Sequence, residues 1–123
     1  MTSPLMLSVV LPTYARAEVL RTTLRHLADQ TLRPEAYEVI VIDDGSPDHT
    51  EEVVRQAVSE SPCRITSLKH ENSGPGYTQN RGILQASAPL ILLMADDIFL
   101  TRGALEAHVA AHERHDKRPE HDN

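Results

Sequence analysis

Four short apolar runs alternate along the chain with longer segments whose apolar residues recur at helical spacing. The runs are Leu7–Leu11, Tyr37–Ile42, Arg64–Leu68 and Leu90–Met94. Three of them are almost continuous in apolar residues, many of them β-branched, which is typical of strands covered on both faces. The run at Arg64–Leu68 mixes polar and apolar residues, so it predicts a weaker, more exposed strand.

The segments between and after these runs predict four helices. In Ala17–Ala28, and in the segment that follows the candidate N-terminal cap Ser46, apolar residues recur at helical intervals. Tyr77–Ala86 and Ala104–His112 are the other two predicted helices. Because strands alternate with helices, the sequence predicts an α/β fold with a parallel sheet and right-handed crossovers.

Polar clusters follow three of the predicted strands. Pro12–Tyr14 follows the first strand, Asp43–Ser46 the second, and Asp96 with Asp97 the fourth. In an open α/β sheet, ligands bind in the crevice beyond the carboxyl ends of the strands. Three such clusters, two of them with adjacent carboxylates, therefore predict a site that holds a metal ion and an anionic ligand.

The adjacent carboxylates of Asp96 and Asp97 repel each other, and a divalent cation is their natural partner. Mg²⁺ and Mn²⁺ prefer oxygen ligands and commonly take one or two carboxylates, with water and substrate phosphates in the remaining positions. A solvated loop or a helix cap is the alternative, and it is the better interpretation of an isolated Asp-Asp pair. The presence of two further polar clusters at the ends of other strands favours the metal site.

The cluster after the second strand suits a nucleoside. A carboxylate of Asp43 or Asp44 can accept hydrogen bonds from the imide or amide edge of a nucleobase, or from a ribose. Gly45 permits a tight turn with positive φ. Tyr14 offers a ring on which a base can stack, with ordinary packing as the competing interpretation.

Size and charge restrict the class of protein. The 123 residues suffice for one domain with a core, which we assign to residues 1–112, and the polar residues 113–123 predict a frayed tail. Twelve Lys and Arg against 18 Asp and Glu give a net charge of −6. This balance lacks the basic footprint of a nucleic-acid-binding protein, so we expect no nucleic-acid partner.

Cysteine content and hydropathy bear on the compartment. Cys63 is the sole cysteine, so no internal disulfide is expected. A reducing compartment is the simplest expectation for the location of the protein. The first residues lack a basic region, and the apolar runs are too short to cross a bilayer. We expect a soluble cytoplasmic protein, with peripheral attachment to a membrane as a further option.

Four segments, in order, resemble the successive motifs of family 2 glycosyltransferases. They are Val9–Tyr14, Val41–Ser46, Asn72–Gly76 with Asn80–Gly82, and Met94–Asp97. Members of this family have the GT-A fold and use nucleotide-diphospho-sugars, most often uridine ones. The resemblance extends from about residue 6 to residue 110. It implies a Rossmann-like GT-A half with a mostly parallel sheet of strand order 3-2-1-4, flanked by helices.

The resemblance also implies roles at the nucleoside end of the site. Pro12, Thr13 and Tyr14 would border the nucleobase. Asp44 would accept a hydrogen bond from uracil, while Asp43 would brace the turn. The expected donor is therefore a nucleotide-diphospho-sugar, most often a UDP-sugar.

At the sugar and phosphate end, the resemblance implies that Asp96 approaches the ribose or the sugar. Asp97 would bind a Mg²⁺ or Mn²⁺ ion that bridges the phosphates. Gly74 and Gly76 would let the backbone pass close to the nucleotide. The implied reaction is an inverting, metal-dependent transfer in which an acceptor hydroxyl, deprotonated by a base, displaces the nucleoside diphosphate.

The chain departs from the family pattern at two positions. The family often has an acid where this chain has Ala95, so only Asp96 and Asp97 remain of that element. The family commonly has an arginine where this chain has Gln79, and Arg81 lies two residues later. Two positions on a helix correspond to a rotation of about 200°, so we expect Arg81 to be mainly a surface residue.

Length is the larger departure. Family members continue into a second half that binds the acceptor and supplies a general base, and nothing between Ile98 and Asn123 resembles it. Glu106 and Glu113 are poor candidates for the base, so the catalytic residue is unknown and the acceptor (a glycan, a lipid or a small molecule) is undefined. A truncated or non-catalytic donor-binding module is the alternative function, and a protein that binds no nucleotide is a third. Apolar sheet surface left uncovered predicts self-association as a homo-oligomer.

Overall fold

The computed structural model describes residues 4–116. The strands are β1 (Leu7–Thr13), β2 (Tyr37–Asp43), β3 (Arg64–Lys69) and β4 (Leu90–Leu93). The helices are α1 (Ala17–Ala28), α2 (Thr50–Glu60), α3 (Pro75–Gln85) and α4 (Ala104–Asp116), with a short 3-10 helix η1 (Pro34–Ala36) before β2. Strands and helices alternate as predicted.

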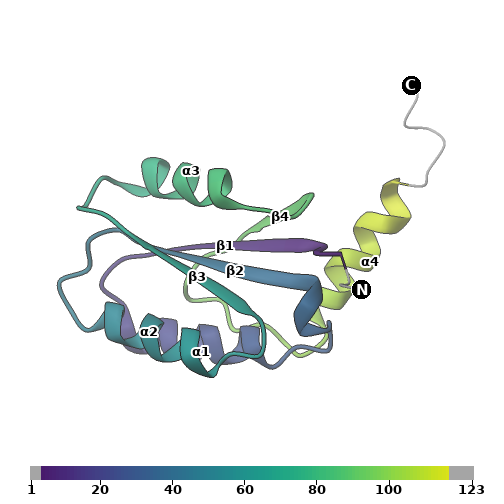
Figure 1. Ribbon diagram of the computed structural model, residues 1–123, viewed down its shortest axis with the longest axis horizontal. Helices are drawn as coiled ribbons and strands as arrows, with labels where there is room; N and C mark the ends of the chain where they lie inside the picture. Colours follow the sequence, from purple (N-terminus) through teal and green to yellow (C-terminus); the bar gives the residue numbers. More distant parts are fainter. Residues whose placement is uncertain (1–3, 117–123) are drawn as a thin grey trace.

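The four strands form one parallel sheet of order β3-β2-β1-β4, as the family resemblance implied. Figure 1 shows α1 and α2 on one face of the sheet, α3 on the other, and α4 near the amino ends of the strands. Every residue of β2 is buried, whereas the edge strands are more open: β3 has one buried residue, and β4 alternates partly exposed and exposed positions. The prediction of a more exposed third strand is confirmed.

Strand β1 continues through Pro12 to Thr13, although the sequence predicted its end at Leu11. The carbonyl oxygen of Val10 accepts from Met94 beyond β4, and that of Thr13 accepts from Asp44 beyond β2. Along β1, the backbone N–H and C=O groups of successive residues point alternately toward β2 and β4. The backbone of Pro12 therefore faces β4, whose pairing with β1 has already ended at Val10. Proline therefore forfeits no ladder hydrogen bond there.

The apolar core has a large part under α1 and α2 and a small part under α3. The small part consists of Val10, Ile40 and Ile42, with Leu68 and Ala86 packed against it. Gly82 of α3 lies directly above it, since a Cβ there would come within 2.6 Å of the Val10 side chain. A glycine at this position lets α3 pack close to the sheet.

Helix α2 begins at Thr50, and Ser46 does not cap it. The Ser46 hydroxyl instead accepts a hydrogen bond from the backbone N–H of Ala15 at 2.8 Å. The first turn of α2 is held by Asp48, whose Oδ1 accepts from the Thr50 N–H at 3.1 Å. The candidate cap was therefore wrong: His49 is the cap residue, without a side-chain cap hydrogen bond, and Asp48 before it binds the first helical N–H.

Two other boundaries differ from the prediction. Helix α3 begins at Pro75, two residues before the predicted start, because proline is favoured in a first helical turn. Helix α4 continues to Asp116, four residues beyond the predicted end at His112. Residues 117–123 of the predicted tail lie outside the described part of the chain.

Apolar side chains remain open to solvent on the edge strand β4. Ile91 and Leu93 are 38% and 42% exposed. Leu93 pairs with Val10, which lies in the small core part, so this face of β4 is on the side of α3. Self-association through this surface stays a prediction. Within residues 4–116, no helix has both the length and the apolar character that are needed to span a membrane.

Candidate functional site

A cleft of about 470 Å³ lies beyond the carboxyl ends of the strands. Its lining residues are Pro12, Thr13, Tyr14, Arg16, Asp44, Asn72, Gly74, Pro75, Thr78 and Asp96. Most of the predicted site residues are among them, but Asp43, Gly76 and Asp97 are not. Two smaller cavities, of about 180 and 310 Å³, lie between α1 and α2 and near the start of β2. Neither of the smaller cavities contains a strand-end carboxylate.

Asp44 is the centre of a dense hydrogen-bond cluster at the end of β2. Its Oδ1 accepts from the N–H of Ser73 at 2.8 Å and lies 3.1 Å from His70 Nε2. Its Oδ2 accepts from the N–H of Gly74 at 3.2 Å and from Asn72 Nδ2 at 3.3 Å. The carboxylate thus fastens the loop after β3 to the end of β2. A further donor would share the more weakly engaged Oδ2.

The environment of Asp44 keeps its carboxylate ionised. Burial opposes the charged form, but the backbone N–H groups of Ser73 and Gly74 outweigh it, and the pKa of Asp44 lies below its usual value. An ionised carboxylate only accepts hydrogen bonds. Asp44 can therefore recognise a ligand through an N–H or O–H group and disfavours one that presents a lone pair.

Asp43 lies beside Asp44 but faces away from the cleft. It is 2% exposed, and its Oδ1 accepts from the backbone N–H of Ser46 at 2.9 Å. This is the turn-bracing contact that the family resemblance implied. Gly45, between them, has φ of +78°, and a Cβ there would lie 2.6 Å from the backbone nitrogen of Asn72. Only glycine lets the two loops approach this closely.

The two acids after β4 differ in how strongly they are constrained. Asp96 is 9% exposed, and its Oδ2 accepts from the Thr13 hydroxyl at 2.9 Å. The Asp97 side chain is 52% exposed. Nη1 of Arg16 lies 3.3 Å from Asp96 Oδ1 and 3.3 Å from Asp97 Oδ2. One cationic group therefore already contacts both carboxylates.

This arrangement fits a divalent ion held by few protein ligands. Oxygens of Asp96 and Asp97 reach the same guanidinium nitrogen, so they can converge on a single cation. Among residues 4–116, no group of three His, Cys, Asp or Glu side chains is placed to hold a metal ion. Two carboxylates, with water and phosphate completing the coordination shell, match the coordination that Mg²⁺ and Mn²⁺ prefer in proteins.

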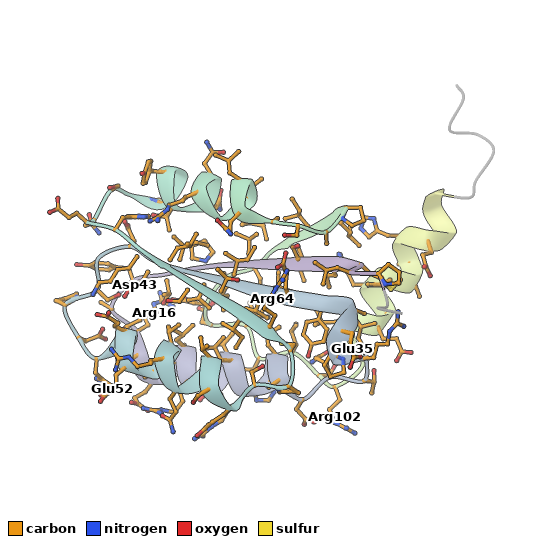
Figure 2. The ribbon with its side chains drawn as sticks, in the orientation of Figure 1. Arg16, Glu35, Asp43, Glu52, Arg64 and Arg102 are labelled. Carbon is orange, nitrogen blue, oxygen red and sulfur yellow. The ribbon has the colours of Figure 1, made fainter. Side chains whose placement is uncertain are left out.

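Figure 2 shows how the labelled charged side chains are distributed. Arg16 and Asp43 lie at the end of the sheet where the strands finish, and Glu35 and Arg102 lie at the opposite end. The segment that follows Asp97 returns along α1, where Arg102 contacts Asp29 at 3.1 Å. The candidate site therefore occupies one end of the domain.

Among the predicted aromatic and glycine positions, Tyr14 and Gly74 line the cleft and Gly76 does not. Tyr14 is 47% exposed at the cleft, so its ring is open to stacking. Gly74 has φ of +94° and precedes α3 as its cap residue. Gly76 lies in the first turn of α3, outside the cleft lining, and a Cβ there would meet nothing within 4 Å. The structure gives no steric reason for glycine at Gly76.

Sequence reasoning missed Arg16 and His70. Arg16 stands between a strand and a helix with no spacing that marks it. His70 follows β3 directly, so its place at the carboxyl edge was the one available signal. Arg81 was expected to be mainly a surface residue, but it is only partly exposed and lies 2.8 Å from His70 Nδ1.

Comparison with known proteins agrees with this geometry. The model of the family described as "Glycosyl transferase family 2" matches residues 8–118, most of the chain. The chain belongs to glycosyl transferase family 2. The motif resemblance and the GT-A half are thereby confirmed, and the cleft coincides with the end of the sheet where the motifs meet.

Two relatives illustrate the family. Validoxylamine A glucosyltransferase of Streptomyces hygroscopicus subsp. limoneus is 40% identical over 109 residues, 87% of this chain and 24% of that protein. TarS of S. aureus, solved in complex with UDP, has 28% identity and a TM-score of 0.80, covering 90% of this chain and 33% of that chain.

A mannosyltransferase from Pyrobaculum calidifontis, solved with GDP-Man and Mn²⁺, is 24% identical with a TM-score of 0.72. It covers 78% of this chain and 28% of that chain, and at this identity it shows the fold alone. The chain thus spans only 24% to 33% of the length of these three proteins.

Proposed function

We propose that this chain forms the donor-binding part of a glycosyltransferase that uses a uridine-diphospho-sugar. The observation that carries the proposal is one cleft lined by Tyr14, Asp44 and Asp96 at the carboxyl ends of three parallel strands. Ligands of open α/β sheets bind at this position. The complex of TarS with UDP supports uridine as the nucleoside.

In this proposal the nucleoside end of the cleft binds by stacking and by one directed hydrogen bond. The uracil ring stacks on Tyr14, whose side chain is half exposed. Asp44 accepts from the imide N–H of uracil through Oδ2, the oxygen with the longer bonds. Pro12 and Thr13 border the same space from the end of β1.

The diphosphate end carries the charge of the leaving group. Asp97, together with Asp96, would hold a Mg²⁺ or Mn²⁺ ion, which as a Lewis acid and template supplies charge stabilisation to the departing diphosphate. Thr13 holds Asp96 in place through its hydroxyl. Arg16 adds a positive charge beside both carboxylates.

The transfer itself is proposed to be inverting, with an acceptor hydroxyl attacking the anomeric carbon after a base removes its proton. No residue described here is assigned as that base. The fact that the chain spans 24% of validoxylamine A glucosyltransferase favours a second candidate, a donor-binding module that is not catalytic by itself. Turnover of a UDP-sugar by the isolated chain would exclude this second candidate.

Calorimetric titration with UDP tests the proposed function. We expect binding in the presence of Mn²⁺ and a loss of at least about tenfold in affinity when Mn²⁺ is omitted or in Asp97→Ala. Asp29→Ala is the matched control, because Asp29 is also largely exposed (66% against 52% for Asp97), also contacts an arginine, and lies at the far end of the domain. Metal-independent binding that survives Asp97→Ala would remove the assignment of Asp97.

A further inference from the structure

A chain of polar contacts runs from α3 through the end of β3 to the Asp44 carboxylate. Nη1 of Arg81 on α3 lies 2.8 Å from Nδ1 of His70, and Nε2 of His70 lies 3.1 Å from Asp44 Oδ1. The His70 side chain is only 12% exposed, so water competes little for either ring nitrogen. Neither His70 nor Arg81 lines the cleft, yet both act on a carboxylate that does.

The neighbours of the His70 ring determine which nitrogen carries the proton. A guanidinium only donates hydrogen bonds, so Nδ1 of His70 must accept from Arg81. A neutral ring then carries its proton on Nε2, which faces Asp44. The Thr78 hydroxyl, 3.1 Å from the same Nε2, donates its own proton to the Gly74 carbonyl at 2.8 Å and turns a lone pair to the ring. These partners assign the Nε2–H tautomer, with Asp44 as the acceptor.

The ring and its arginine are both held in place. Arg81 Nη1 also donates to the Lys69 carbonyl oxygen at 3.0 Å, which anchors the guanidinium to the end of β3. Tyr77 packs edge-on against the His70 ring, with centroids 4.9 Å apart at 76°. The imidazole therefore meets Asp44 from a fixed direction.

We propose that His70, locked in one tautomer by Arg81, is a positioning residue that aims the Asp44 carboxylate at the nucleobase. The proposal rests on the proposed function, in which Asp44 accepts from a base N–H. His70 and the Ser73 N–H occupy Oδ1, whereas the bonds to Oδ2 are the longer ones, at 3.2 and 3.3 Å. Oδ2 is thereby the oxygen turned to the ligand.

A pair of variants separates this role from simple packing. The amide nitrogen of a glutamine reaches about as far as Nε2 of histidine, whereas that of an asparagine reaches only about as far as Nδ1. We expect His70→Asn to weaken UDP binding about tenfold and His70→Gln to stay within about threefold of the unaltered protein. The preference for UDP over CDP, which lacks the ring N–H, should shrink in His70→Asn and persist in His70→Gln.

Nitrogen-15 NMR of the imidazole tests the same proposal in the ligand-free protein, and its deciding readout comes from the unaltered chain. His70 should show a protonated Nε2 and an unprotonated Nδ1, and Arg81→Leu should mix the two tautomers. A protonated Nδ1 in the unaltered protein would overturn the proposal. Equal UDP affinities of His70→Asn, His70→Gln and the unaltered protein would overturn it as well, while leaving the proposed function intact. If the unaltered protein does not bind UDP, the proposed function fails, and the inference with it.

Discussion

The two pairs of adjacent aspartates lie at the same end of the sheet but differ in how the protein uses them. Asp43 and Asp44 are 2% and 6% exposed, and their oxygens accept hydrogen bonds that close the turns around them. Asp97 is half exposed, and it shares one arginine with Asp96. The first pair is part of the scaffold. In the second pair, Asp96 is 9% exposed and accepts from Thr13, whereas Asp97 is open to a ligand.

This difference shows that a carboxylate at a strand end can be structural and still recognise a ligand. Asp44 orders the loop that contains Ser73 and Gly74, and that loop forms one wall of the cleft. Asp97 orders little, so its charge is compensated mainly by the half-exposed Arg16 or by an ion. Losing Asp44 should therefore damage both stability and binding, whereas losing Asp97 should damage binding alone.

The largest effect is expected for Asp44→Asn. The amide of asparagine has one NH₂ group. In either orientation this group would face donors that now bond to Asp44, so donor would meet donor. We expect the free energy of unfolding to fall by about 3 kcal/mol, measured by urea denaturation. Asp97→Asn is the control, and its change should stay within about 0.5 kcal/mol. Equal losses in the two variants would contradict the division of roles.

Gly45→Ala should come next. The substitution places a Cβ against the backbone of Asn72 and imposes a positive φ on alanine. We expect a loss of about 2 kcal/mol in the free energy of unfolding, together with weaker UDP binding, because the two loops separate. Gly103→Ala, where a Cβ meets nothing within 4 Å, should change neither. A stable Gly45→Ala variant would show that the loops tolerate separation.

Acid should reveal the structural role of Asp44. Opposed by burial but favoured by the N–H groups of Ser73 and Gly74, its pKa in the folded protein lies below the unfolded value of about 3.9. Its stabilising contribution is therefore present above that pH and is lost as the pH falls through the folded pKa. Stability should decline less steeply with acid in Asp44→Asn than in the unaltered protein. Parallel declines would contradict the hydrogen-bond account of Asp44.

The smallest effect is expected for Arg16→Gln. Removing the guanidinium that contacts Asp96 and Asp97 should strengthen Mn²⁺ binding to the nucleotide-free protein by no more than about fivefold, because ion pairs made by a half-exposed arginine are weak. Paramagnetic relaxation of water protons measures this affinity. Arg102→Gln removes a comparable ion pair at the other end and should leave it unchanged. Weaker Mn²⁺ binding in Arg16→Gln would show that Arg16 supports the ion site instead of competing for it.

Local sequence patterns were sufficient to predict the elements, because apolar runs and helical spacing reflect burial directly. The order of the strands came from the family resemblance. The end of β1 was missed because Pro12 is tolerated only where β4 has stopped pairing, which depends on tertiary contacts. Ser46 was misassigned because Asp48 lies nearer to the start of α2 and Ser46 is used by the neighbouring turn.

The candidate site was predictable where the acids stand at strand ends, and not where cations meet them. Arg16 and His70 are separated from their acidic partners by 80 and 26 residues along the chain. No spacing rule connects residues so far apart in the sequence. Their roles depend on the crossover connections that bring the ends of β1, β2, β3 and β4 together.

The most direct test of the nucleotide-binding cleft is an amide NMR titration of the protein with UDP and Mg²⁺. Shifts confined to the ends of β1 and β2, the loop before α3 and the segment after β4, including the N–H groups of Tyr14, Gly74 and Asp97, are the predicted result. The amides of Arg64 and Ser87, at the opposite end of the sheet, should not respond. Shifts centred on the cavity between α1 and α2, or no shifts at saturating UDP, would contradict the account.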